Sequence, residues 1–397
     1  MDKLQPFLEQ ARAIVADAHA RYPHAEGLFN GRLAVQPSRS GAPQRAQRFH
    51  TKVGNIAYSA ALSPTLGGLP REGYATALHL VSLQQVVSGA TAPVIGGLGA
   101  YGPLYNIAIQ VSNRQPYNLY GFEANAFAEI FYAPYKDTET ASPLVTSSTN
   151  NWINDVWIPM TISPDSEIGA WYLNDPELTV DLAITGGTTA QAFSTVNAAT
   201  IQGSWDVYVE RFSAPAPDQP GGWINEVSYY VEHKFFGSYQ LKNGETIIYL
   251  DRDRDYARIM LIFFTGAHDA TFAPAAGLFT TVELQIGDTI SVIKPIAEQE
   301  LRDEMLRNYA WSTAGSGTKN LRPGVYCLDF LVQKQFHTLS RRDILPTDSA
   351  ITNQVALRIV STSASNNVDV VVSYASDNPF AQKWVASAAA KGALKAA

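Results

Sequence analysis

The feature that most constrains the fold is a proline- and glycine-rich segment in the middle of the chain, residues 213–222. Its three prolines and two adjacent glycines can form neither a central strand nor a helix interior. It divides the chain evenly, because residues 51–212 and residues 223–384 each number 162. The full length of 397 residues also exceeds the roughly 250–300 residues at which a single hydrophobic core stops growing. We therefore expect two domains of equal size joined by a linker.

Both halves are predicted to be all-β. Phe, Tyr and Trp supply 11% of the residues, and 28 Gly with 22 Pro supply many turns, a composition that favours many short strands over helices. In the first half, β-like runs cover residues 52–61, 76–87, 104–111, 156–162, 178–184 and 204–212. In the second half, they cover residues 224–236, 246–250, 258–265, 280–286, 324–332, 355–361 and 368–374.

The spacing of the strand-like runs in the second half resembles that in the first. Residues 205–209 close the first half much as residues 368–372 close the second, and residues 157–162 correspond in place to residues 325–331. One helix interrupts the second half, where Ala297, Leu301, Met305 and Tyr309 share one side. Helical periodicity is hard to find in the first half after residue 50.

The two ends of the chain differ from its body. Residues 1–50 hold seven Lys/Arg against four Asp/Glu, which gives this arm a net charge of +3 on a chain of net charge −7. Apolar residues fall at helical spacing between residues 6 and 22 and predict one amphipathic helix. Its apolar stripe packs on its own domain, on a neighbouring subunit or on a membrane. Residues 385–397 are predicted to form a basic C-terminal tail.

The sequence contains partial matches to binding motifs, but the residues around each match do not fit the motif. Residues 97–102 match G-x-G-x-x-G, but Pro103 and a strand-like run follow, whereas a dinucleotide site requires a helix there. Asp251, Asp253 and Asp255 alternate as calcium ligands do, but the turn glycine and the final acid are missing, so we expect an ion-paired loop or strand edge. The seven histidines show no metal-binding spacing. We therefore expect no enzyme, no cofactor and no metal site.

Other signals point to a protein that is retained in the cell of synthesis. Cys327 is the only cysteine, and its apolar setting predicts a buried thiol. No apolar run of about 18 residues occurs, and acids interrupt the first twenty residues. The sequence thus predicts neither a signal peptide nor a transmembrane helix, and we expect the protein to be made and kept in the cytoplasm until it is packaged into something larger.

Several segments resemble the tectivirus-type major capsid proteins of membrane-containing icosahedral bacteriophages. The resemblance is sharpest at Leu321-Arg322-Pro323-Gly324-Val325-Tyr326-Cys327, which leads into a strand after the predicted helix. In the first half it rests on residues 102–106, 156–160, 166–170 and 177–184, in that order. The resemblance implies an all-β fold of two tandem eight-stranded jelly rolls, a double jelly roll, with an N-terminal amphipathic helix and short extra helices. The units would be residues 1–50, 51–212, 213–222, 223–384 and 385–397.

The resemblance also implies a function in assembly. The chain would form homotrimers of pseudo-hexagonal outline that tile an icosahedral virion shell over an internal lipid membrane, together with minor capsid and vertex proteins and without sequence-specific binding of nucleic acid. The N-terminal helix would lie at the inner side of the shell. The expected membrane-facing or inner-shell contacts are Lys3, Phe7, Leu8, Arg12, Ile14, Val15, Arg21 and Arg32. The alternative is a jelly-roll phage module that binds a receptor or a carbohydrate.

Overall fold

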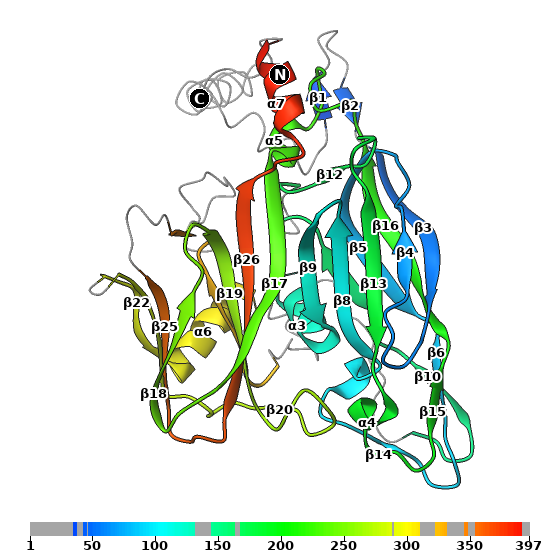
Figure 1. The fold of residues 1–397 in the computed structure, drawn as a ribbon, viewed down its shortest axis with the longest axis vertical. Helices are drawn as coiled ribbons and strands as arrows, with labels where there is room; N and C mark the ends of the chain where they lie inside the picture. The colour runs from blue at the N-terminus through cyan, green and yellow to red at the C-terminus, as the bar shows by residue number, and fades with distance from the viewer. Residues whose placement is uncertain are drawn as a thin grey trace, which may run out of the picture.

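The computed structural model of the chain contains two β-sandwiches that stand side by side (Figure 1). It describes residues 35–37, 43–45, 47–131, 144–162, 167–287, 290–309, 322–331, 345–347 and 354–390. The long strands run roughly parallel to the long axis of the molecule, with the first sandwich on the right of Figure 1 and the second on the left.

Eight strands build the first sandwich. They are β3 (Gln47–Ala57), β4 (Thr65–Gly67), β5 (Tyr74–Ser82), β8 (Leu104–Val111), β9 (Arg114–Tyr120), β11 (Val156–Pro159), β13 (Val180–Gly186) and β16 (Ser204–Ser213). One sheet has the order β11-β5-β16-β3, and the facing strands have the order β9-β8-β13-β4. Two facing antiparallel sheets connected in this way form a jelly roll.

Eight further strands build the second sandwich. They are β17 (Tyr229–Gln240), β18 (Gly244–Leu250), β19 (Asp255–Thr265), β21 (Thr281–Ile286), β22 (Ile290–Ala297), β23 (Val325–Asp329), β25 (Val355–Ser361) and β26 (Asn367–Asp377). Here β23 pairs with β19 in the order β23-β19-β26-β17, and the facing sheet has the order β22-β21-β25-β18.

The two sandwiches have the same topology. Numbered in chain order within each unit, the strands lie in the order 6-3-8-1 in one sheet and 5-4-7-2 in the other, in both units. The predicted correspondence between the two halves is confirmed, because β11 and β23 are the sixth strands of their units and β16 and β26 are the eighth. The helices α3 (Gly121–Phe131) and α6 (Glu298–Tyr309) also correspond, since each follows the fifth strand of its unit. The chain is therefore a double jelly roll, as the sequence predicted.

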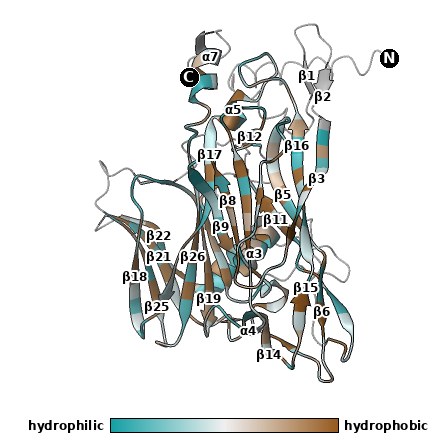
Figure 2. Cartoon of the chain, turned by 45° about the vertical axis from the view of Figure 1, so that its right-hand side comes forward, coloured by the Kyte–Doolittle hydropathy of each residue, from teal (hydrophilic) through white to brown (hydrophobic). Residues whose placement is uncertain are grey.

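One continuous sheet joins the two units. Strand β9 of the first pairs in parallel with β17 of the second, which completes the order β20-β19-β26-β17-β9-β8-β13-β4, with β20 at Ala273–Pro274. Strand β19 is buried on both faces from Tyr256 to Phe264, which explains its nearly continuous apolar sequence. Hydrophobic residues gather along the strands and α3 in the interior of the molecule (Figure 2).

Shorter elements occupy the two ends of the molecule. At the upper end of Figure 1 lie β1 (Val35–Pro37), β2 (Pro43–Arg45), α5 (Ile224–Val227), β12 (Trp171–Tyr172) and α7 (Gln382–Ala390). At the lower end of the first jelly roll lie β6 (Gln84–Val87), β7 (Val94–Ile95), β10 (Thr149–Trp152), β14 (Phe193–Thr195), β15 (Thr200–Gln202) and α4 (Thr189–Ala192). The turn η1 (Gly99–Tyr101) leads into β8, and β24 (Leu345–Pro346) pairs with β19.

Two local predictions are wrong. Residues 121–131 form the helix α3, which was not predicted, because nearly every side of this helix is buried and its sequence shows no apolar stripe. The strand predicted from residue 224 begins only at Tyr229, since residues 224–227 form the short helix α5. There Val227 packs against Tyr74 and Ala381 at the upper end of the molecule.

Candidate functional site: the seam between the two jelly rolls

The seam between the two units begins at the parallel pairing of β9 with β17. His233 lies opposite Tyr117 in this pairing, and Phe127 of α3 packs on the same histidine with ring centroids 4.7 Å apart. His233 is completely buried, with Nδ1 2.8 Å from the Ser373 hydroxyl. Burial and the nearby Arg258 lower the pKa of His233 to about 3. The seam thus contains a neutral histidine at neutral pH.

A buried ion pair lies beside this histidine. Arg258 of β19 donates from Nε to Asp329 of β23 over 2.8 Å, and both side chains are almost fully buried. The same guanidinium donates to the backbone carbonyl of Ile162, which belongs to the first jelly roll. Arg258 therefore connects the two units. The ion pairs of Arg258 with Asp329 and of Arg254 with Glu232 support the expectation that the charged run at residues 251–258 is ion-paired.

The segment that carries the sharpest family resemblance has a structural role at the seam. Arg322 donates two hydrogen bonds to Glu129 of α3, and its guanidinium carbon lies 5.2 Å from the centre of the Phe122 ring. Gly324 has a positive φ of 79°, and a Cβ there would lie 2.5 Å from the carbonyl oxygen of Phe263. Cys327 is buried, as predicted. The motif thus anchors the start of β23 to the first unit.

The C-terminal helix crosses from the second unit to the first. Lys383 of α7 pairs with Asp175 at 2.8 Å and with Glu177 at 2.7 Å. Trp384 donates to the other oxygen of Asp175 over 3.3 Å, and Ser387 donates to Asp218 in the linker. The hollow beside these residues has a volume of about 20 Å³, which is room for a water molecule and too small for a sugar.

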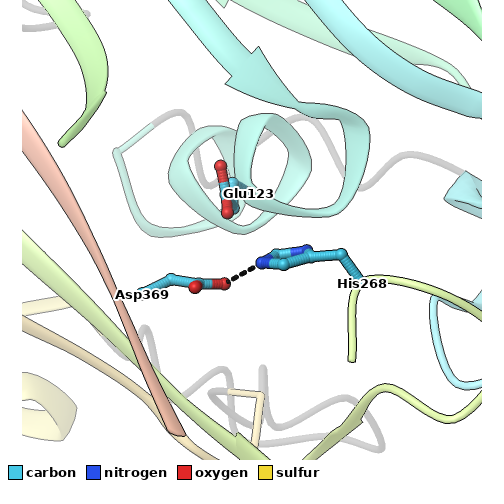
Figure 3. Close-up of side chains that lie close together, drawn as sticks. All are labelled: Glu123, His268 and Asp369. Atoms are coloured by element: carbon cyan, nitrogen blue, oxygen red, sulfur yellow. Dashed lines mark ion pairs between the residues drawn. The ribbon is translucent and has the colours of Figure 1, made fainter. Parts of the chain in front are cut away.

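A cluster of three ionisable side chains lies deeper in the seam (Figure 3). Glu123 comes from α3 of the first unit, Asp369 from β26 of the second, and His268 from the turn after β19. One ligand atom from each residue lies within 4.8 Å of the other two. Figure 3 shows the His268 ring directed toward the Asp369 carboxylate, with the Glu123 side chain beside this pair. The two carboxyl groups are completely buried.

The electrostatics of this cluster are unbalanced. His268 Nε2 lies 2.8 Å from Asp369 Oδ2 and forms the ion pair of the cluster. Among the described residues, Asp369 Oδ1 and Glu123 Oε1 have no hydrogen-bond partner. Burial raises the pKa of Glu123 well above its ordinary value, and the charge of Asp369 raises it further. In water-free surroundings, such unsatisfied oxygens are costly unless a proton or a cation is present.

Sequence reasoning did not find this cluster. Its residues lie far apart in the chain and have no local spacing that a metal-binding motif would require. The sequence contains one weak signal of the cluster. Asp369 interrupts the apolar run of β26, and a charged residue inside such a run needs a partner. Only the pairing of the strands identifies that partner.

The eight predicted membrane-facing or inner-shell residues, from Lys3 to Arg32, lie outside the residues that the structure describes. The described part of the chain contains no helix that is long and apolar enough to cross a membrane. Exposed apolar side chains include residues on two strands at opposite sides of the molecule, β3 and β18 (Figure 1). Phe49 of β3 is 39% exposed, and Ile247 and Tyr249 of β18 are 43% and 62% exposed.

Comparison with known proteins supports the fold at low sequence identity. No protein family and no curated protein match the sequence. The STIV MCP, from Sulfolobus turreted icosahedral virus, superposes with a TM-score of 0.62 at 14% identity, over 85% of this chain and 98% of that one. The major capsid protein P2 of bacteriophage PM2 gives 0.50 at 14% identity, over 83% and 97%. VP54 of PBCV-1 gives 0.51 at 9% identity, over 84% and 94%. The chain thus has the double jelly-roll fold of these proteins.

Proposed function

We propose that the chain is a viral major capsid protein that acts by self-assembly. The observation that carries the proposal is the repeated topology of two jelly rolls fused side by side by β9 and β17, over nearly the whole length of known capsid proteins. Two equivalent units in one chain give a homotrimer six similar lobes. Six lobes suit a hexagonal outline, which tiles the facets of an icosahedral shell.

The exposed apolar side chains support a ring of three chains. Strands β3 and β18, which carry the exposed Phe49 and Tyr249, lie on opposite sides of the paired jelly rolls (Figure 1). A head-to-tail contact that joins one side to the other closes into a ring when the rotation is suitable. Exposed aromatic side chains are also enriched in the centres of protein interfaces. We therefore infer that the β18 side of one chain contacts the β3 side of the next.

The native mass of the purified full chain tests this arrangement. We expect a trimer, with three times the chain mass of 43.2 kDa. Tyr249→Arg places a charge in the inferred contact and should shift the trimer toward monomer. Because Tyr249 is exposed, the monomeric variant should melt at nearly the same temperature as the parent monomer. Val94→Arg, at an exposed residue of β7 at the lower end, is the matched control and should leave the trimer intact. A monomeric or dimeric parent that binds glycans would favour the receptor- or carbohydrate-binding alternative.

We further infer that the upper end of Figure 1 faces an internal lipid membrane. The N-terminal arm joins the described chain at β1 on this end, and α7 lies on the same end. Phe7, Leu8, Ile14 and Val15 provide an apolar face for lipid, and Lys3, Arg12, Arg21 and Arg32 provide positive charge. Near an anionic membrane surface, each such charge contributes about 1 kcal/mol.

Flotation with liposomes separates the two contributions of the arm. Replacing the four apolar residues by serine should abolish binding to both neutral and anionic liposomes. Replacing Lys3, Arg12, Arg21 and Arg32 by glutamine should weaken binding to anionic liposomes only. Deletion of residues 1–34 leaves every described strand in place, and unchanged liposome binding by that variant would refute the membrane contact.

The remaining assignments follow from this proposal. Synthesis would take place in the host cytoplasm, and the mature location would be the virion capsid. Minor capsid and vertex proteins would be the further partners, without sequence-specific contacts to nucleic acid. No catalytic function is needed for assembly of this kind.

A further inference from the structure

The buried cluster of Glu123, His268 and Asp369 combines two carboxyl groups with a single basic side chain. In the described part of the chain, His268 is the only basic residue that pairs with either carboxyl group. If both carboxyl groups are ionised, the site has a net negative charge even when the histidine is protonated. Such a charge inside a protein requires compensation by a bound cation or by protonation.

The donor atoms define which cation would fit. We propose that Glu123, His268 and Asp369 bind one divalent transition-metal ion, of which Zn²⁺ is the representative. Carboxylate oxygens alone suit Mg²⁺ or Ca²⁺, whereas an imidazole nitrogen beside two carboxylates suits Zn²⁺ and its neighbours. Glu123 Oε1 and Asp369 Oδ1, which have no hydrogen-bond partner among the described residues, are the groups that a bound ion would satisfy.

The distances are compatible with this assignment. Zinc binds nitrogen and oxygen at about 2.0–2.2 Å in tetrahedral geometry, so its ligand atoms lie about 3.3–3.6 Å apart. The ligand atoms of the cluster lie within 4.8 Å of one another, and side-chain movements of about 1 Å would bring all three to bonding distance of one ion. Two of the three ligands, Glu123 and Asp369, lie on α3 and β26 and are completely buried.

The surroundings hold the ligands in position. The backbone N–H of Tyr120 donates to Glu123 Oε2 over 3.1 Å, and the Tyr120 ring stacks on His268 with centroids 4.5 Å apart. Phe264 and Phe272 contact the same imidazole, with centroids 5.3 and 5.2 Å away. A hydrogen-bonded carboxylate and a fixed imidazole within an apolar shell are typical second-sphere features of metal sites.

The position of the site gives it a structural role. Glu123 belongs to the first jelly roll, and Asp369 and His268 belong to the second. One ion bound by all three would therefore join the two units at their seam. This role is independent of whether the chain forms capsids, so the two proposals can fail separately.

Equilibrium dialysis of the full chain against Zn²⁺, after removal of metals with EDTA, tests the site directly. We expect one tightly bound Zn²⁺ per chain. Glu123→Gln and Asp369→Asn preserve side-chain shape and should each weaken this binding at least tenfold. Glu226→Gln is the matched control, because Glu226 is a second glutamate whose pKa burial raises, and it lies outside the cluster. This variant should bind as the parent does.

Melting temperature provides a second readout, which separates metal binding from simple folding defects. In EDTA, Glu123→Gln should melt at or above the parent temperature, because it removes an uncompensated buried carboxyl group. Added Zn²⁺ should raise the melting temperature of the parent and of Glu226→Gln only. The proposal is overturned if the parent binds no Zn²⁺, or if Glu123→Gln and Asp369→Asn bind it as well as the parent. Either result would indicate that a proton shared by the two carboxyl groups balances the site.

Discussion

Arg322 holds Glu129 with two parallel hydrogen bonds, from Nε to Oε2 over 2.7 Å and from Nη2 to Oε1 over 3.0 Å. The pair joins the segment before β23, in the second jelly roll, to α3 in the first. Both side chains are about three-quarters buried. A planar guanidinium matches a carboxylate in this two-point geometry, whereas a lysine ammonium does not.

We therefore expect Arg322→Lys to destabilise the chain although it keeps the charge. The loss of one hydrogen bond and of the packing on Phe122 should lower the free energy of unfolding by about 1–2 kcal/mol. The midpoint of urea denaturation measures the change. Arg358→Lys is the control, because Arg358 pairs with Glu245, whose side chain is 41% exposed, within one jelly roll and not across the seam, and its replacement should have little effect. Equal effects of the two substitutions would show that the seam pair has no special role.

Gly324 should be intolerant of a side chain for two separable reasons. Its φ of 79° is unfavourable for other residues, and a Cβ would clash with backbone atoms of Phe263 and Ala275. Gly277 has a φ of 81° with nothing within 4 Å of its Cβ position. We expect Gly277→Ala to cost about 1 kcal/mol and Gly324→Ala clearly more, as measured by thermal melting. Similar losses would mean that the surroundings of Gly324 relax around the new methyl group.

His233 should make the chain sensitive to acid. Its pKa is about 3 in the folded state and 6.5 in a model compound, so the unfolded chain takes up the proton first. The contribution of neutral His233 is therefore fully present above pH 6.5 and is lost as the pH falls toward 3. Between pH 6.5 and 5, the free energy of unfolding should fall by up to about 2 kcal/mol from this group alone.

The control for this prediction is His233→Gln, which cannot titrate. Urea denaturation of both proteins at pH 7.5 and pH 5 gives the difference that belongs to His233. Arg258 faces the imidazole and disfavours its protonation, and it is unchanged in the variant. An identical loss of stability in the two proteins would show that other groups account for the acid sensitivity.

Most of the strands could be predicted because their sequences have clear local signals. Two runs, Leu104–Val111 and Val355–Ser361, coincide with β8 and β25, where apolar stretches end at turn residues. The repeated topology was also visible as a pattern, since the sixth and eighth strands of the two units correspond. The predicted unit boundaries remain a prediction, and β3 begins at Gln47, a few residues before one of them.

The errors have physical causes. Helix α3 is enclosed between the sheets and the second unit, so its residues from Phe122 to Ile130 lack the polar face by which helices are recognised. The cluster of Glu123, His268 and Asp369 depends on the pairing of β9 with β17 and of β17 with β26, which are contacts between distant segments. No local spacing predicts such a register.

The most direct test of the central proposal is electron microscopy of the purified full chain, sorted into class averages. Two equivalent jelly rolls in each of three chains should give a three-fold particle with six similar lobes and a hexagonal outline. A particle without three-fold symmetry, or a monomer that remains single both alone and in the presence of liposomes, would contradict the assignment as a major capsid protein.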